Sequence, residues 1–187
     1  MARPGGGDHG ARDRARVLSR RRIYEGKVLS LDRDEVEEPG GVRATREVVR
    51  HSGSVAVLAV RDDGAIVLVR QYRYPVDEAL WELPAGRRDK GESPEAAAQR
   101  ELQEEIGFRA EDLEPIAFFY TTPGFCDEAM HVFRATRLVA AAAKGDEDER
   151  LEVRAFPLRE LEAMIARGEI REGKTLVALL LESRRSR

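Results

Sequence analysis

The chain has 187 residues, of which 36% are charged, and its formal net charge is -3. This length suffices for one domain with a real core. The near balance of charges argues against nucleic acid or an anionic membrane as a partner, and no apolar run approaches the roughly 20 residues that cross a bilayer. The composition agrees with a soluble enzyme.

Residues 1–18 are rich in glycine, arginine and aspartate and contain no hydrophobic segment. We expect a disordered tail rather than a secretory signal, followed by a single domain over residues 19–187. Cys126 is the only cysteine, so no disulfide can form within the chain. This usage fits a reducing compartment and predicts a cytoplasmic protein.

The first half of the domain predicts strands. Residues 22–31 and residues 36–51, the latter around a turn at Pro39-Gly40-Gly41, read as an antiparallel pair. Residues 54–60 and 65–72 form a hairpin across Arg61-Asp62-Asp63-Gly64. A short strand over residues 80–83 ends at Pro84-Ala85-Gly86.

A helix follows, with clear signals at both ends. Ser93 is a good N-cap, and Pro94 suits the first helical position, where its missing N–H costs nothing. Gly107 can take the left-handed conformation that ends a helix. Ala98, Leu102 and Ile106 recur every four residues and predict the buried stripe.

Five glutamates lie on or beside this helix: Glu92, Glu95, Glu101, Glu104 and Glu105. Glu101 and Glu105 share a face, and like charges at this spacing weaken a helix by roughly 0.2–0.5 kcal/mol per pair. Only Arg100 is near enough to offset them. The cluster therefore indicates a bound cation, and carboxylate oxygens suit hard ions such as Mg²⁺ or Mn²⁺.

The second half predicts further strands and two helices. Residues 113–120 and 129–138 read as strands around the loop 121–128, and residues 151–156 as another strand after a polar loop over 140–150. Apolar spacing predicts helices over residues 158–167 and 174–183. The whole is one unit of the α/β or α+β class.

Residues 86–108 resemble the Nudix hydrolases. That family shares a box of Gly, five residues, Glu, seven residues, then Arg-Glu-aliphatic-x-Glu-Glu-x-Gly-aliphatic. The chain matches every glycine and charged position, with Gly86, Glu92, Arg100, Glu101, Glu104, Glu105 and Gly107. The one departure is Phe108, at a packing position. The resemblance implies a mixed β-sheet sandwiched between α-helices. It also implies an N-terminal antiparallel extension over residues 19–51 that forms a homodimer, with the catalytic core over residues 52–187.

The same resemblance implies roles for the box. Glu101 and Glu105 would be the central metal ligands, Glu104 a further ligand or a residue that orients one, and Glu92 a ligand through water. The carbonyl of Ala85 would complete a metal shell, and Arg100 would hold the glutamates in place. Mg²⁺ is the expected cofactor and Mn²⁺ its substitute. A glutamate of the loop 144–149 would act as general base, Glu149 first and Glu147 next; solvated loop charges are the alternative.

Three features resemble the branch active on ADP-ribose. Pro123 lies sixteen residues after Gly107, within Thr121-Thr122-Pro123-Gly124-Phe125. Gln71-Tyr72-Arg73-Tyr74-Pro75 precedes Trp81-Glu82-Leu83-Pro84-Ala85-Gly86. The motifs of two other branches of the family, the diadenosine polyphosphate hydrolases and the NADH pyrophosphatases, are missing. Arg73 would contact a phosphate or the terminal ribose, and Arg46 and Glu47 would contribute to an adenine pocket, where Arg46 or Tyr24 replaces a stacking tryptophan.

The implied reaction is hydrolysis of ADP-ribose, a small-molecule nucleoside diphosphate derivative, to AMP and ribose 5-phosphate. Two alternatives stay open. The first is another substrate for the same chemistry, such as a nucleotide sugar or an oxidised nucleotide. The second is a nucleotide sensor that binds without hydrolysis, although such proteins usually lose box glutamates and this chain keeps them all.

Overall fold

The computed structural model describes residues 14–142 and 151–185. The chain divides into two compact units. The first takes the residues up to Ser52 together with Tyr120–Ala129, and the second takes Gly53–Phe119 and Met130–Arg187. Among the described residues, no helix is both long and apolar enough to span a membrane.

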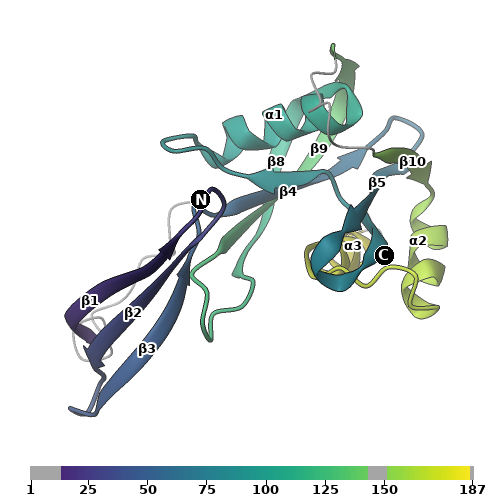
Figure 1. Cartoon of the computed structure of the whole chain (residues 1–187). Helices are drawn as coiled ribbons and strands as arrows, with labels where there is room; N and C mark the ends of the chain where they lie inside the picture. The colour runs from purple at the N-terminus through teal and green to yellow at the C-terminus, as the bar shows by residue number, and fades with distance from the viewer. Residues whose placement is uncertain (1–13, 143–150, 186–187) are drawn as a thin grey trace. The chain divides into compact units, whose positions relative to one another are not determined.

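The first unit is built on a three-stranded antiparallel sheet of β1 (Arg16–Glu25), β2 (Ser30–Glu37) and β3 (Arg43–Arg50), in that order (Figure 1). We expected two strands here, and a tail as far as residue 18. Instead β1 begins at Arg16, and a turn in which Gly26 N–H donates to Leu29 O separates it from β2.

Buried charge explains why β2 was missed. The side chains of Asp32, Asp34 and Val36 alternate into the buried face of β2, so two of its three inward positions are carboxylates. Arg20 of β1 donates two hydrogen bonds to Asp34, and Arg50 of β3 contacts both aspartates. Because these positions are charged, the strand lacks the alternation of apolar residues by which strands are recognised.

The loop after Tyr120 belongs to the first unit. Val49 N–H donates to Phe125 O at 2.8 Å, and Asp127 N–H donates to Val49 O at 3.1 Å. Asp127 also accepts from His51 N–H at 2.8 Å and from Arg50 Nη1 at 3.3 Å. These bonds attach the loop to the edge strand β3.

The second unit is a mixed seven-stranded sheet with helices on both faces (Figure 1). Its main path runs β10-β5-β4-β9-β8, with β6 beside β5 and β7 beside β4. Strand β4 is parallel to β9 and antiparallel to β5 and β7.

The strands of this unit are β4 (Ser54–Val60), β5 (Ile66–Arg73), β6 (Glu78–Glu82), β7 (Ala85–Arg87), β8 (Phe108–Tyr120), β9 (Ala129–Ala140) and β10 (Glu152–Phe156). Its helices are α1 (Pro94–Ile106), α2 (Leu158–Ala166) and α3 (Gly173–Arg185), with a 3₁₀ turn η1 (Tyr74–Val76).

Strand β4 is buried along its whole length because both of its faces are covered. Val55, Val57 and Ala59 face a core completed by Ala98 and Leu102 of α1. The alternate residues, such as Leu58, face a second core formed with α2 and α3. The expected sheet between helices is therefore confirmed.

Helix α1 has the expected ends. Ser93 Oγ accepts from Ala96 N–H at 3.1 Å, and Pro94 occupies the first helical position. Gly107 adopts φ 71°, and its N–H donates back to Gln103 O at 3.2 Å. These ends fix which residues of α1 face β4 and β7.

We predict that Leu102→Ala lowers the free energy of unfolding by about 2–5 kcal/mol, because Leu102 lies on the buried face of α1 and is fully buried. Urea unfolding followed by circular dichroism measures this. Leu180→Ala on α3 is the control, since Leu180 is 54% exposed and the expected change is within about 0.5 kcal/mol. Equal losses in the two variants would contradict the packing described for α1.

Candidate active site

Strand β7 and helix α1 carry the acidic cluster. The Glu101 carboxylate lies against Gly86, where a Cβ atom would fall 2.0 Å from Glu101 Oε1. Glu105 Oε2 accepts from Ala85 N–H at 3.0 Å. The two glutamates that share a face of α1 therefore both reach the short strand β7. Any side chain at position 86 would displace Glu101.

Arg100 gathers three of the glutamates. Its guanidinium donates to both carboxylate oxygens of Glu92 at 3.0 Å, to Glu101 at 2.7 Å and to Glu104 at 2.9 Å. It also donates to Arg87 O at 3.0 Å, which ties α1 to β7. The role of Arg100 in positioning the box stays a prediction, and these contacts are the ones it would use.

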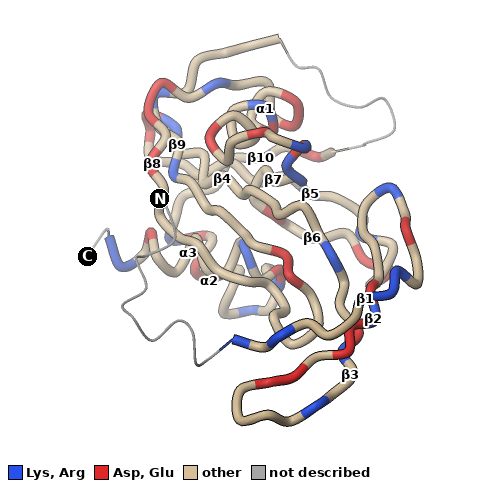
Figure 2. Tube along the Cα trace, turned by 90° about the vertical axis from the view of Figure 1, so that its left-hand side faces the viewer, with Lys and Arg blue, Asp and Glu red and all other residues tan. Residues whose placement is uncertain are grey.

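The charges respond to this arrangement. The hydrogen bonds from Arg100 lower the pKa of Glu92 below its ordinary value. The same contact with Glu92, reinforced by Glu101 and Glu104, raises the pKa of Arg100. Both groups stay charged at neutral pH, so Glu92 is held as a carboxylate in the loop just before α1. Acidic segments recur along α1 in the tube coloured by charge (Figure 2).

The donor set fits a hard divalent cation. Glu92, Glu101, Glu104 and Glu105 offer carboxylate oxygens, Ala85 offers a carbonyl, and oxygen ligands are those that Mg²⁺ and Mn²⁺ prefer. The missing Cβ of Gly86 lets a carboxylate approach β7. Within residues 14–142 and 151–185, however, no three His, Cys, Asp or Glu side chains already stand as a metal shell. Arg100 instead holds several of the carboxylates.

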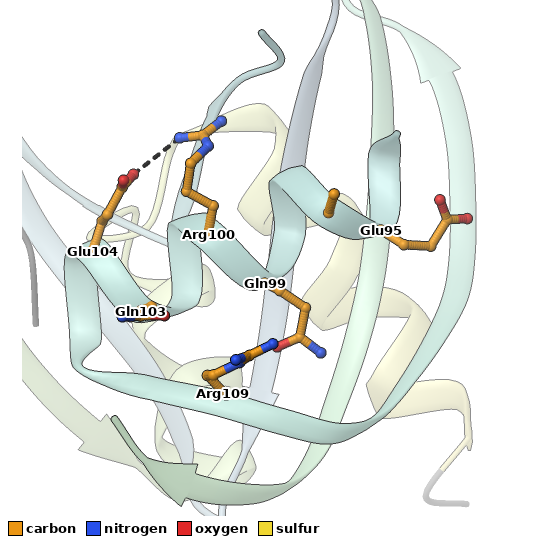
Figure 3. A pocket seen from close by; sticks show the side chains of 7 residues that line it. Glu95, Gln99, Arg100, Gln103, Glu104 and Arg109 are labelled. Carbon is orange, nitrogen blue, oxygen red and sulfur yellow. Dashed lines mark hydrogen bonds and ion pairs between the residues drawn. The ribbon is translucent and has the colours of Figure 1, made fainter. Parts of the chain in front are cut away.

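A hollow of about 570 Å³ lies along the outer side of α1. Arg100 and Glu104 line it together with Glu95, Gln99, Gln103 and Arg109, and Figure 3 shows Glu104 turned towards Arg100. Two of these side chains serve the fold, since Gln99 bonds the backbone of Ala110 and Gln103 donates to Ala142 O. Glu92, Glu101 and Glu105 do not line this hollow.

Arg73 ends β5 and is held by a residue that sequence reasoning passed over. Its Nε and Nη2 atoms each donate to Glu82 at 2.8 Å, and the Glu82 side chain is only 1% exposed. This pairing with Glu82 raises the pKa of Arg73, and the Glu105 charge adds to the effect. Arg73 thus lies within electrostatic reach of the box. The signal for Glu82 was a lone carboxylate inside the otherwise apolar run Leu80–Leu83.

The other expected substrate residues gather in the first unit. Arg46, Glu47 and Pro123 line one hollow of about 400 Å³, formed between β3 and the loop that follows Tyr120. Val48, Tyr120 and Phe125 lie in the same wall. Arg46 also pairs with Glu38 at 2.5 Å. The expected general bases, Glu147 and Glu149, lie outside the described residues.

Three relatives share most of the chain. The ADP-ribose pyrophosphatase of Bacillus subtilis (strain 168) is 43% identical over 88% of this chain and 90% of its own length. The methanol dehydrogenase activator of Bacillus methanolicus is 40% identical over the same shares. The GDP-mannose pyrophosphatase of Yersinia enterocolitica serotype O:8 / biotype 1B (strain NCTC 13174 / 8081) is 34% identical over 78% of this chain and 82% of that protein.

A solved structure titled as an ADP compounds hydrolase has the same fold. Its TM-score is 0.79 at 27% identity, over 91% of this chain and 92% of that one. Residues 16–49 match the nucleoside diphosphate sugar hydrolase N-terminal domain, and residues 50–179 match the NUDIX domain. The match to the NUDIX domain spans most of the chain and includes the glutamates that converge on β7, so this chain belongs to the Nudix family.

Proposed function

We propose that the chain hydrolyses the diphosphate bond of ADP-ribose, so that ADP-ribose and water yield AMP and ribose 5-phosphate. The observation that carries this proposal is the convergence of Glu101 and Glu105 on Ala85 and Gly86 within an intact Nudix box. The ADP-ribose pyrophosphatase of Bacillus subtilis supports the choice of substrate, since it is 43% identical.

Nudix hydrolases generally use divalent metal ions, and we propose Mg²⁺ here, with Mn²⁺ as a substitute. The residues that would hold it are Glu101 and Glu105, then Glu104, Glu92 and the carbonyl of Ala85. Bound there, such an ion neutralises charge on a diphosphate and acidifies a bound water.

The remaining roles belong to the chain's own side chains. Arg100 would orient Glu92, Glu101 and Glu104 through the hydrogen bonds that it donates to them. Arg73 would donate to a phosphate oxygen of the substrate. Glu149, or Glu147 next, would accept a proton from the attacking water, with Glu104 as the candidate within the described residues.

For the nucleoside end of the substrate we propose contacts with Arg46, Glu47 and Pro123, which line one hollow. We also propose that the chain acts as a homodimer through residues 19–51, without nucleic acid as a partner. A cytoplasmic location is proposed from the single, partly buried thiol of Cys126.

A nucleotide sugar is the second candidate substrate. The Yersinia enterocolitica relative, named a GDP-mannose pyrophosphatase, is 34% identical to this chain. The same box chemistry would serve either substrate, because both contain a diphosphate linkage. The complete set of box glutamates disfavours a sensor that binds nucleotides without hydrolysis.

A panel of substrates distinguishes ADP-ribose from a nucleotide sugar as the preferred substrate. We predict the highest kcat/KM for ADP-ribose among ADP-ribose, GDP-mannose, NADH and an oxidised nucleoside triphosphate, with AMP and ribose 5-phosphate as the products. Turnover of GDP-mannose tenfold faster than that of ADP-ribose would contradict the specific proposal while leaving a Nudix pyrophosphatase.

Replacing a central glutamate tests the role of the box. We predict that Glu105→Gln lowers kcat/KM by about 100-fold or more, because charge stabilisation by a bound metal is worth several kcal/mol. Steady-state kinetics at a fixed Mg²⁺ concentration measures this. Glu95→Gln is the matched control on the same helix and should stay within threefold. A Glu105→Gln variant within threefold of the unmodified protein would show that the metal assignment is wrong.

The solution mass tests the proposed dimer. We predict twice the 21.0 kDa chain mass by light scattering, because every residue of β1 is exposed, including the apolar side chains of Val17 and Ile23, which are each 49% exposed. Removal of residues 1–13 should leave this mass ratio unchanged. A monomer at micromolar concentration would contradict the proposal.

A further inference from the structure

Glu82, at the end of β6, is a buried carboxylate to which the proposed reaction assigns no role. Its side chain is 1% exposed, and two cations meet on it. Arg73 binds it through two hydrogen bonds of 2.8 Å, and Lys174 Nζ donates to Glu82 Oε2 at 2.5 Å. Burial raises the pKa of Glu82, but the two cations outweigh burial and hold the pKa below its ordinary value. An ionised carboxylate this deep is tolerated only with such partners.

Lys174 comes from the first turn of α3, far along the chain from β6. Its side chain is 10% exposed, and it also contacts Glu172 Oε2 at 3.2 Å. Thr175 next to it accepts from Leu83 N–H at 2.9 Å and donates to Glu172 at 2.9 Å. The start of α3 is thus fastened to the segment that runs from Glu82 to the strand of Ala85 and Gly86.

Arg73 is therefore held from one side. Its Nε and Nη2 atoms face Glu82, whereas its Nη1 atom donates no hydrogen bond among the described residues. The Arg73 side chain is 39% exposed, so part of it is open to solvent. A planar guanidinium clamped along one edge presents its other end in a fixed direction, which suits it to grip a phosphate oxygen.

We propose that Lys174 and Glu82 are positioning residues for the diphosphate substrate, acting through Arg73. The positive charge of Lys174 offsets part of the negative charge of Glu82. Glu82 can therefore orient the Arg73 guanidinium without cancelling all of its positive charge. Arg73 then keeps its positive charge available to a phosphate oxygen. This inference rests on the proposed function, because it needs a diphosphate substrate that Arg73 contacts.

We predict that Lys174→Met raises KM for ADP-ribose about tenfold with kcat within threefold, and that Lys174→Arg restores KM to within threefold. A charged hydrogen bond is worth about 1.5–3 kcal/mol, and 1.4 kcal/mol corresponds to tenfold. A change confined to KM is expected when substrate and transition state lose the same contact. Arg185→Met, on an exposed cation of the same helix paired with Glu114, is the control and should leave both constants unchanged.

A double-mutant cycle separates positioning from a purely structural role. If Lys174 acts through Arg73, adding Lys174→Met to Arg73→Met changes KM by less than twofold. Independent, multiplying effects on KM would overturn the proposal. Thermal unfolding of each variant checks that it folds. If Lys174→Met does not fold, Glu82→Gln replaces it in the cycle with Arg73→Met, and there too multiplying effects would overturn the proposal.

The proposed function fails separately. If the unmodified protein cleaves only GDP-mannose, the cycle is run with that substrate, since the inference concerns the diphosphate and not the sugar. If the unmodified protein cleaves no diphosphate compound, the proposed function is wrong, and this inference falls with it. Activity on ADP-ribose with multiplying effects in the cycle would remove the inference alone.

Discussion

The close approach of Glu101 to the backbone of Gly86 is the constraint on which the site depends. Only a residue without a Cβ leaves room for the carboxylate, since a Cβ would lie 2.0 Å from Oε1. Glu105, one turn further along α1, accepts a hydrogen bond from Ala85 N–H. The energy that holds these charges together comes from the cores beneath them, where Leu102 and Ala98 pack against β4.

Charge in this protein is organised by shared arginines. Arg100 holds three glutamates, Arg73 holds Glu82, and Arg50 bridges Asp32, Asp34 and Asp127. A planar guanidinium carries several N–H donors in a fixed fork, so it can donate to two carboxylates at once. The Arg100 and Arg73 centres lie in the second unit, and the Arg50 centre joins the sheet and the loop that form the hollow of the first unit.

The sequence predicted local structure well where one signal repeats or where ends are marked. Helix α1 was fixed by Ser93, Pro94 and Gly107, and the spacing of the box brought its glutamates to one strand. It predicted poorly where partners lie far apart in the chain. Strand β2 was not predicted because Asp32 and Asp34 occupy its buried positions, where apolar residues are expected. The hydrogen bond between Val49 and Phe125 joins residues that are far apart in the sequence. Lys174 and Glu82 are likewise far apart in the chain, so no local pattern predicts the contact between them.

The central claim is that the acidic cluster of α1 exists to bind divalent cations that prepare a diphosphate for attack by water. Isothermal titration calorimetry of the full chain with Mg²⁺ and with Mn²⁺, in the presence of a non-cleavable ADP-ribose analogue, tests this directly. We predict saturable uptake by the unmodified protein and much weaker uptake by the Glu105→Gln variant. Absence of uptake of either ion by the unmodified protein would contradict it.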